Sequence, residues 1–138
     1  MNCKPEKCLV SSCLIGLCTR YDGCSKPDAA CLQALQDFHY IPVCPEQLGG
    51  LPTPRTAADL TGGDGMDVLK GQSLVINRDG VDVSREFIAG ARAVLQIAKA
   101  QNIRLAMLKA KSPSCGMTPV LGVTAALLRE HGIRIIEF

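Results

Sequence analysis

Cysteine is the residue type in this chain with the widest range of possible chemistry. Eight cysteines occur among 138 residues, at positions 3, 8, 13, 18, 24, 31, 44 and 115. A thiolate can ligate a metal or attack an electrophile, whereas a buried thiol can simply fill space in a core. The N-terminal sequence MNCKPEKCLVSS lacks the sustained apolar stretch of a signal peptide, so we expect a cytoplasmic protein with reduced thiols. Metal binding or thiol chemistry is therefore expected in preference to a disulfide framework.

The spacing of the cysteines bears on which metal they could hold. No C-x-x-C pair occurs, which disfavours a zinc ribbon. The two histidines, His39 and His131, form no ligand spacing, and each falls near the end of an expected helix, where a cation is favoured. A site built from cysteine alone favours an iron–sulfur cluster over catalytic zinc. Two alternatives stay open: a metal-free thiol enzyme with Cys115 as its nucleophile, or a non-enzymatic iron–sulfur or sulfur-carrier protein.

The elements that would position these residues follow from hydrophobic periodicity. We expect strands over residues 8–12, 40–44, 105–108 and 133–138, a hairpin of residues 73–77 with 81–83, and helices over 27–38, 85–101 and 123–130. The prolines and glycines between Pro45 and Pro54 predict a rigid loop without helix. This order predicts an α/β fold: a tail over residues 1–7, then a single compact domain over 8–138, with a mainly parallel sheet and flanking helices.

The amino-acid composition limits the kinds of molecule that this protein is expected to bind. Hydrophobic residues make up 47% of the chain, which is enough for a core and excludes a mainly disordered state. Fifteen basic residues face 13 acidic ones without a basic run, so we expect no nucleic-acid polymer as partner. No apolar stretch is long enough to cross a membrane. A small-molecule partner is expected, bound by a monomer or a small homo-oligomer.

A cysteine lies at or after the carboxyl end of three expected strands: Cys13 and Cys115 follow theirs, and Cys44 ends its own. Ligands of open α/β sheets bind outside the carboxyl ends of the strands, so we expect these thiols to meet there. Cys18 is an alternative to Cys13, which lies nearer its strand. Glu46 lies beside Cys44, where it could act as an acid–base catalyst, cap a turn or pair with an arginine.

Polar residues near these cysteines are candidate substrate contacts. Arg20 and Asp22 could bind polar groups of a substrate or pair with each other at the surface, and Arg55 could orient an anionic or carbonyl group. The candidate substrate-binding residues are Arg20, Tyr21, Asp22, Arg55 and Ser114.

Three segments together, SSCLIGLCTRYDG, VCPEQLGGLPTPR and LKAKSPSCG, closely resemble the DUF523 family of thiouracil desulfidases, and GVTAALLREHGI also fits. The resemblance implies a compact α/β domain with a [4Fe–4S] cluster on three cysteines, which removes sulfur from a thiolated pyrimidine without net electron transfer. Carried over by motif, it implies Cys13 (or Cys18), Cys44 and Cys115 as cluster ligands. It implies Glu46 as the catalytic carboxylate and Ser112 as its hydrogen-bonding partner, ahead of Ser114 as the alternative. Cys3, Cys8, Cys24 and Cys31 lie outside the pattern.

Overall fold

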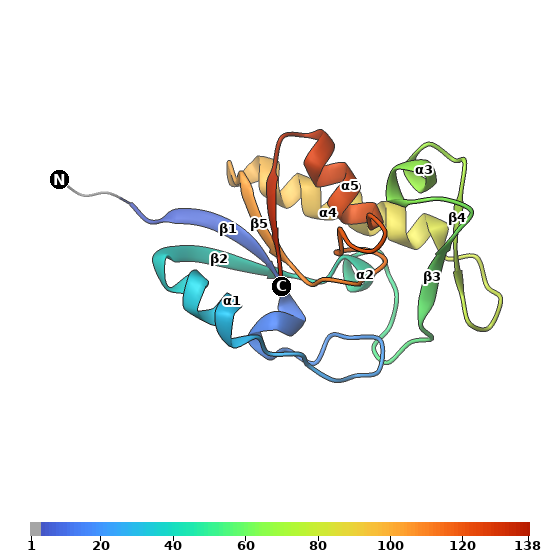
Figure 1. The fold of residues 1–138 in the computed structure, drawn as a ribbon, viewed down its shortest axis with the longest axis horizontal. Helices are drawn as coiled ribbons and strands as arrows, with labels where there is room; N and C mark the ends of the chain where they lie inside the picture. The colour runs from blue at the N-terminus through green and yellow to red at the C-terminus, as the bar shows by residue number, and fades with distance from the viewer. Residues whose placement is uncertain (1–3) are drawn as a thin grey trace.

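A four-stranded parallel sheet forms the centre of the protein, whose computed structural model describes residues 4–138 (Figure 1). The strand order is β2-β1-β5-β6, and every neighbouring pair is parallel. The strands are β1 (Glu6–Ser11), β2 (Phe38–Val43), β5 (Leu105–Leu108) and β6 (Arg134–Glu137). The predicted α/β class is confirmed. Strand β1 begins at Glu6, inside the segment expected to be a tail.

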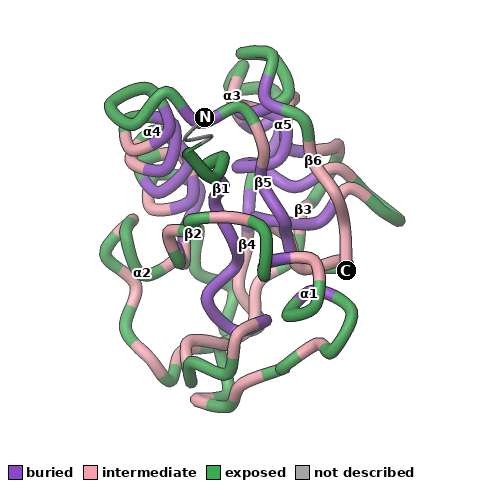
Figure 2. The backbone as a smooth tube through the Cα atoms, turned by 90° about the vertical axis from the view of Figure 1, so that its left-hand side faces the viewer, coloured by how far each residue is buried: buried purple, intermediate pink, exposed green. Residues whose placement is uncertain are grey.

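Helices cover both faces of this sheet (Figure 1). Helix α1 (Ala29–Ala34) lies on one face, and α4 (Ser84–Ala100) and α5 (Val123–Glu130) pack together on the other. Successive residues of β1 serve the two layers, because Leu9 packs with α4 and α5 whereas Cys8 and Val10 pack with α1. Burial on both faces explains the continuous apolar run of β1, and the buried stretches of β1 and β5 are purple in Figure 2.

Helices α1 and α4 differ from expectation mainly at their ends. The side chain of Asp28 caps α1 by accepting from the Cys31 amide at 2.8 Å, and the helix gives way to a 3-10 turn over Leu35–Asp37. The buried face of α4 is almost wholly apolar, and the helix begins at Ser84. Its hydroxyl accepts from the Val75 amide at 2.8 Å.

A second, smaller unit packs against the first half of α4. It comprises β3 (Ala58–Thr61), α3 (Gly65–Leu69) and β4 (Leu74–Asn77), and its two strands are antiparallel. The predicted hairpin is present in short form, because residues 81–83 return antiparallel to β4 through the Ile76–Asp82 bridge, with backbone hydrogen bonds from Asn77 to Val81 and from Val83 to Val75, each 2.9 Å long. Strand β4 also pairs with β3, which the sequence did not predict. Residues 81–83 lead directly into α4 and have no length left for a strand. Between β3 and β4, a capping box of Asp64 and Asp67 begins α3.

The segment after β2 contains a short helix that the prolines were expected to forbid. Helix α2 (Pro45–Leu48) has proline at its first position, where the missing amide hydrogen costs nothing. It packs on α4 through two glycines: Gly49 meets the Glu86 carbonyl, and Gly90 meets the Pro45 carbonyl. Among residues 4–138, no helix combines the length and apolar character needed to span a bilayer.

Candidate active site

A cavity of about 630 Å³ opens at the carboxyl ends of β1, β2 and β5. Three cysteines line it, each from a different segment. Cys13 lies in the 3-10 turn Ser12–Ile15 that follows β1, Cys44 is the N-cap of α2, and Cys115 lies in the loop after β5. The topology therefore brings together three thiols that are up to about a hundred residues apart in the chain.

The three thiols are neighbours of one another and are mostly shielded from solvent. Cys13 and Cys115 are buried, and Cys44 is partly exposed. Burial raises the pKa of the Cys13 thiol, and the Cys44 thiol raises it further. Burial likewise raises the pKa of Cys115 to about 12, against the opposing hydrogen bonds of Ser11 and Ser114, and Cys44 adds to the increase. Without a metal, Cys115 is therefore a neutral thiol and a poor nucleophile.

This donor set suits an iron–sulfur cluster better than a single ion. Among residues 4–138, no three His, Cys, Asp or Glu side chains surround one common point closely enough for a lone metal ion. A four-iron cluster is a larger body, so its thiolate ligands stand further apart than those of a single ion. All three candidate donors here are sulfur atoms lining one cavity, which is the ligand type that iron–sulfur clusters use.

Glu46 projects from α2 into the same cavity with both carboxylate oxygens engaged. Oε1 accepts from Nε of Arg55 at 3.0 Å, and Oε2 accepts from the Ser114 hydroxyl at 3.0 Å. The side chains of Arg55 and Glu46 are only 5% and 14% exposed, so this ion pair is largely shielded from solvent. The carboxylate is thus held in one orientation beside Cys44 and Cys115.

The partner of Glu46 is Ser114, which corrects the expectation that Ser112 has this role. Ser112 lines the cavity too, but its hydroxyl contacts the Ser114 hydroxyl at 3.0 Å and accepts from the Ser114 and Cys115 amides at 3.2 and 3.1 Å. A serine that binds the amides of the next residues folds the loop locally. Ser112 therefore shapes the turn that presents Ser114 and Cys115.

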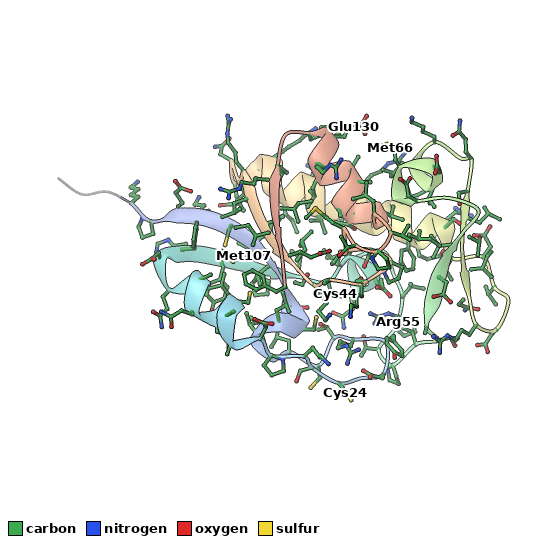
Figure 3. The ribbon with its side chains drawn as sticks, viewed as in Figure 1. Cys24, Cys44, Arg55, Met66, Met107 and Glu130 are labelled. Atoms are coloured by element: carbon green, nitrogen blue, oxygen red, sulfur yellow. The ribbon has the colours of Figure 1, made fainter. Side chains whose placement is uncertain are left out.

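Arg55 lies inside the site, not at its rim. It pairs with Glu46, as one of the alternatives considered from sequence required, and its other nitrogens contact Thr53, Pro52, Thr19 and Cys44. Figure 3 shows Arg55 and Cys44 near each other beneath α2. These contacts occupy the guanidinium, so its assignment as a substrate-binding residue stays a prediction without support from this geometry.

Some residues of the loop after Cys13 line the cavity, and others lie outside its lining. Arg20 and Tyr21 line the cavity, and the Arg20 guanidinium stacks 5.6 Å from the Tyr21 ring centre. Asp22 does not line the cavity and pairs with Arg20 at 3.5 Å. Cys18 is exposed and also outside the lining, so the geometry favours Cys13 over Cys18 as a ligand.

The remaining cysteines lie away from the cavity. Cys8 and Cys31 are fully buried among apolar residues between β1 and α1, as core thiols. Cys24 is exposed on an outer loop, clear of Cys44 (Figure 3). Cys3 falls outside the described residues.

Several charged residues that line the cavity were missed from the sequence. Lys109 and Lys111 belong to the LKAKSPSCG segment and could have been found there, whereas Asp59 and Arg78 come from the smaller unit, whose position the sequence did not reveal. The cationic side chains lining the cavity are Arg20, Lys26, Arg55, Arg78, Lys109 and Lys111. Glu46 and Asp59 are its carboxylates, so positive charge predominates.

Comparison with known proteins agrees with this site. The family model described as 2-thiouracil desulfurase matches residues 8–137. An uncharacterised protein of Bacillus subtilis (strain 168), YbbK, is 38% identical over 141 residues, covering 94% of this chain and 93% of YbbK. The solved structure of the [4Fe–4S]-dependent thiouracil desulfidase TudS matches with a TM-score of 0.80 and 40% identity, over 96% of this chain and 90% of TudS. The chain therefore belongs to the 2-thiouracil desulfurase family, the DUF523 family that its sequence motifs resemble.

Proposed function

We propose that this protein is a desulfidase that exchanges the sulfur of a thiolated pyrimidine, or a similar thiocarbonyl compound, for oxygen. The observation that carries the proposal is a carboxylate fixed at both oxygens, Glu46, in one cavity with three thiols. Family membership and the similarity to TudS support it. The free thiols of the described cysteines are compatible with a reducing, cytoplasmic setting, which we also propose.

The cluster ligands in this proposal are Cys13, Cys44 and Cys115, with Cys18 as the less favoured alternative to Cys13. A [4Fe–4S] cluster bound by three thiolates has one iron without a protein ligand, and when bound it supplies a Lewis acid for a soft thiocarbonyl sulfur. Ligation requires thiolates, so binding a cluster would displace the protons that the buried cysteines otherwise keep.

The chain's own contribution to the chemistry is general-base catalysis by Glu46. Its carboxylate takes a proton from water as the water oxygen bonds to the ring carbon of the thiocarbonyl. The carbon–sulfur bond then breaks as the hydroxyl of the adduct gives up its remaining proton and becomes the carbonyl, and sulfur leaves with both protons of the water as hydrogen sulfide. Substrate, water, oxo product and hydrogen sulfide balance without an oxidant or reductant. Ser114 and Arg55 keep the carboxylate aimed at this water.

The competing interpretations predict different results. A metal-free thiol enzyme needs a reactive Cys115, but that thiol is buried and its pKa is raised to about 12. A sulfur-carrier protein has no need of a carboxylate fixed in the cavity.

The deciding experiment measures iron and acid-labile sulfide after anaerobic reconstitution, and then conversion of 2-thiouracil to uracil. We expect about four of each per chain, and turnover that Glu46→Gln abolishes without loss of iron. A chain without iron, or an active Glu46→Gln variant with its cluster intact, would contradict the proposal.

A further inference from the structure

We propose that Arg55 is a positioning residue that links the catalytic carboxylate to a cluster thiolate. This inference rests on the proposed function and assigns a role within the same site. Its basis is a guanidinium whose three nitrogens all have partners although the side chain is 5% exposed. A buried charge with so many fixed contacts does not have the freedom that a substrate-binding side chain needs.

The contacts of Arg55 fall into three groups, one for each nitrogen. Nε donates to Oε1 of Glu46 at 3.0 Å. Nη1 donates to the Thr53 hydroxyl at 2.9 Å and the Pro52 carbonyl at 3.2 Å, which anchors the guanidinium to its own loop. Nη2 donates to the Thr19 carbonyl at 2.9 Å and lies 3.8 Å from Sγ of Cys44. One planar group thus spans the loop after β1, the first turn of α2 and the loop after α2.

The hydrogen bonding between Arg55 and Cys44 would change if Cys44 became a cluster ligand. As a thiol, Cys44 donates to the Thr19 carbonyl at 3.6 Å, beside the nitrogen Nη2. As a thiolate, it has no proton to donate, and Nη2 is the donor already within reach of its sulfur. Hydrogen bonds to cluster sulfur withdraw electron density and stabilise the reduced state, so this donor raises the reduction potential of a bound cluster.

The contact with Glu46 governs catalysis through orientation. Ser114 fixes Oε2, and Arg55 fixes Oε1, so loss of the arginine leaves the carboxylate free to rotate about its remaining contact. Lysine retains the positive charge, but its single compact ammonium group cannot make the separate hydrogen bonds that the planar guanidinium makes through its three nitrogens. Arg55→Lys therefore tests the hydrogen-bond geometry of this residue while its positive charge is retained.

The test compares Arg55→Lys with the matched control Arg92→Lys, whose arginine is exposed on α4 and is not among the residues that line the cavity. We expect Arg55→Lys to retain iron, to shift the reduction potential of the cluster to a more negative value, and to lower kcat by about 10–100-fold with KM nearly unchanged. Arg92→Lys should match the wild type in all three measurements.

The same substitution is also tested in the Glu46→Gln variant, where the reduction potential can be measured even if little activity remains. In Glu46→Gln, adding Arg55→Lys should shift the potential as before, because the Cys44 contact is independent of the carboxylate, and should not lower any residual turnover further. Thr53→Val removes the hydroxyl that accepts from Nη1 and from the Gln47 side chain, but leaves Nη1 its bond to the Pro52 carbonyl. This milder variant should shift the potential in the same direction by less.

The outcomes distinguish this inference from the proposed function. A wild-type chain with no cluster would overturn the proposed function, and this inference with it. A cluster-bearing, active wild type whose potential and kcat are unchanged in Arg55→Lys would overturn the role of Arg55 alone. Loss of iron in Arg55→Lys together with an unshifted potential in Thr53→Val would equally overturn it, because Arg55 would then be a structural support only.

Discussion

Replacing Gly90 with alanine should reduce turnover far more than it reduces stability. Gly90 lies in α4 where α2 crosses it, and an added Cβ would lie 1.9 Å from the Pro45 carbonyl oxygen and 2.7 Å from its carbon. Restoring an ordinary contact of about 3.5 Å requires α2 to move by roughly 1.5 Å. Helix α2 begins at Pro45, between Cys44, the proposed ligand, and Glu46, the proposed catalytic carboxylate, so this shift displaces both.

The size of the effect follows from the contacts of Glu46. Its hydrogen bonds to Arg55 and Ser114 are each 3.0 Å long, and a shift of this size takes them out of range. A misplacement of about 1 Å at a reacting group can cost about 100-fold in rate, so we expect kcat/KM to fall by about that factor. Stability changes less, because overpacking costs about 1–3 kcal/mol while alanine gains about 1 kcal/mol over glycine within a helix.

The assay measures kcat/KM with 2-thiouracil, iron per chain, and the urea midpoint of unfolding. Ala89→Gly is the control, since residue 89 lies on the exposed side of the same helix. It should lose about 0.5–1 kcal/mol of stability and keep full activity. Wild-type activity in Gly90→Ala would refute the argument that the close approach of α2 and α4 positions Glu46.

Three further predictions concern ligands, the carboxylate and the C-terminal strand. Serine at any candidate ligand should abolish iron binding, whereas Cys18→Ser should retain iron in the same assay. These ligand positions are Cys13, Cys44 and Cys115. Ser114→Ala should lower kcat by about 10–100-fold with iron retained, because it frees Oε2 of Glu46, and an unchanged kcat would argue against this contact. Burial alone would raise the pKa of Glu137, but hydrogen bonds from the Met117 amide and from Thr118 hold it below its usual value. The stability from Glu137 is thus present above the unfolded pKa of about 4.3 and is lost as pH falls through the lower folded pKa. Glu137→Gln should therefore destabilise the protein at pH 7 but have little effect at the acid end of that window, as urea unfolding would show.

Prediction from sequence succeeded best for elements whose hydrophobic residues recur regularly and whose surroundings are uniform along their length. The buried face of α4 and the fully buried run of β1 were both recognisable, because one sits on a core along its length and the other is covered on both sides. Strand β3 was missed, since its four residues alternate only between partly buried and exposed positions, whereas β4 was expected as one strand of the hairpin. Pairing of β4 with β3 depends on tertiary packing against α4, which no local pattern reports.

For the site, too, the features that follow from the strand topology could be predicted, and those that depend on local loop geometry could not. That Cys13, Cys44 and Cys115 share a cavity follows from their places after parallel strands. Which hydroxyl faces Glu46 does not follow, because Ser112 and Ser114 are separated by one proline and only the folded turn decides which of them points at the carboxylate. The motif predicted a serine partner, and the loop geometry selects Ser114.

The charge of the cavity gives a physical reason why buried thiols and excess cations occur together. Burial disfavours the thiolate forms of Cys13 and Cys115, so these residues stay protonated unless a metal displaces the protons. The displaced protons leave negative charge on sulfur in the cavity that also holds the carboxylate of Glu46. Lys109 and Arg20 both act to lower the pKa of Cys13, against burial and against Cys44. The cationic lining therefore offsets the cost of holding several anionic ligands together, which a neutral Cys115 nucleophile would not require. Burial and charge thus both favour a metal centre over thiol catalysis in this cavity.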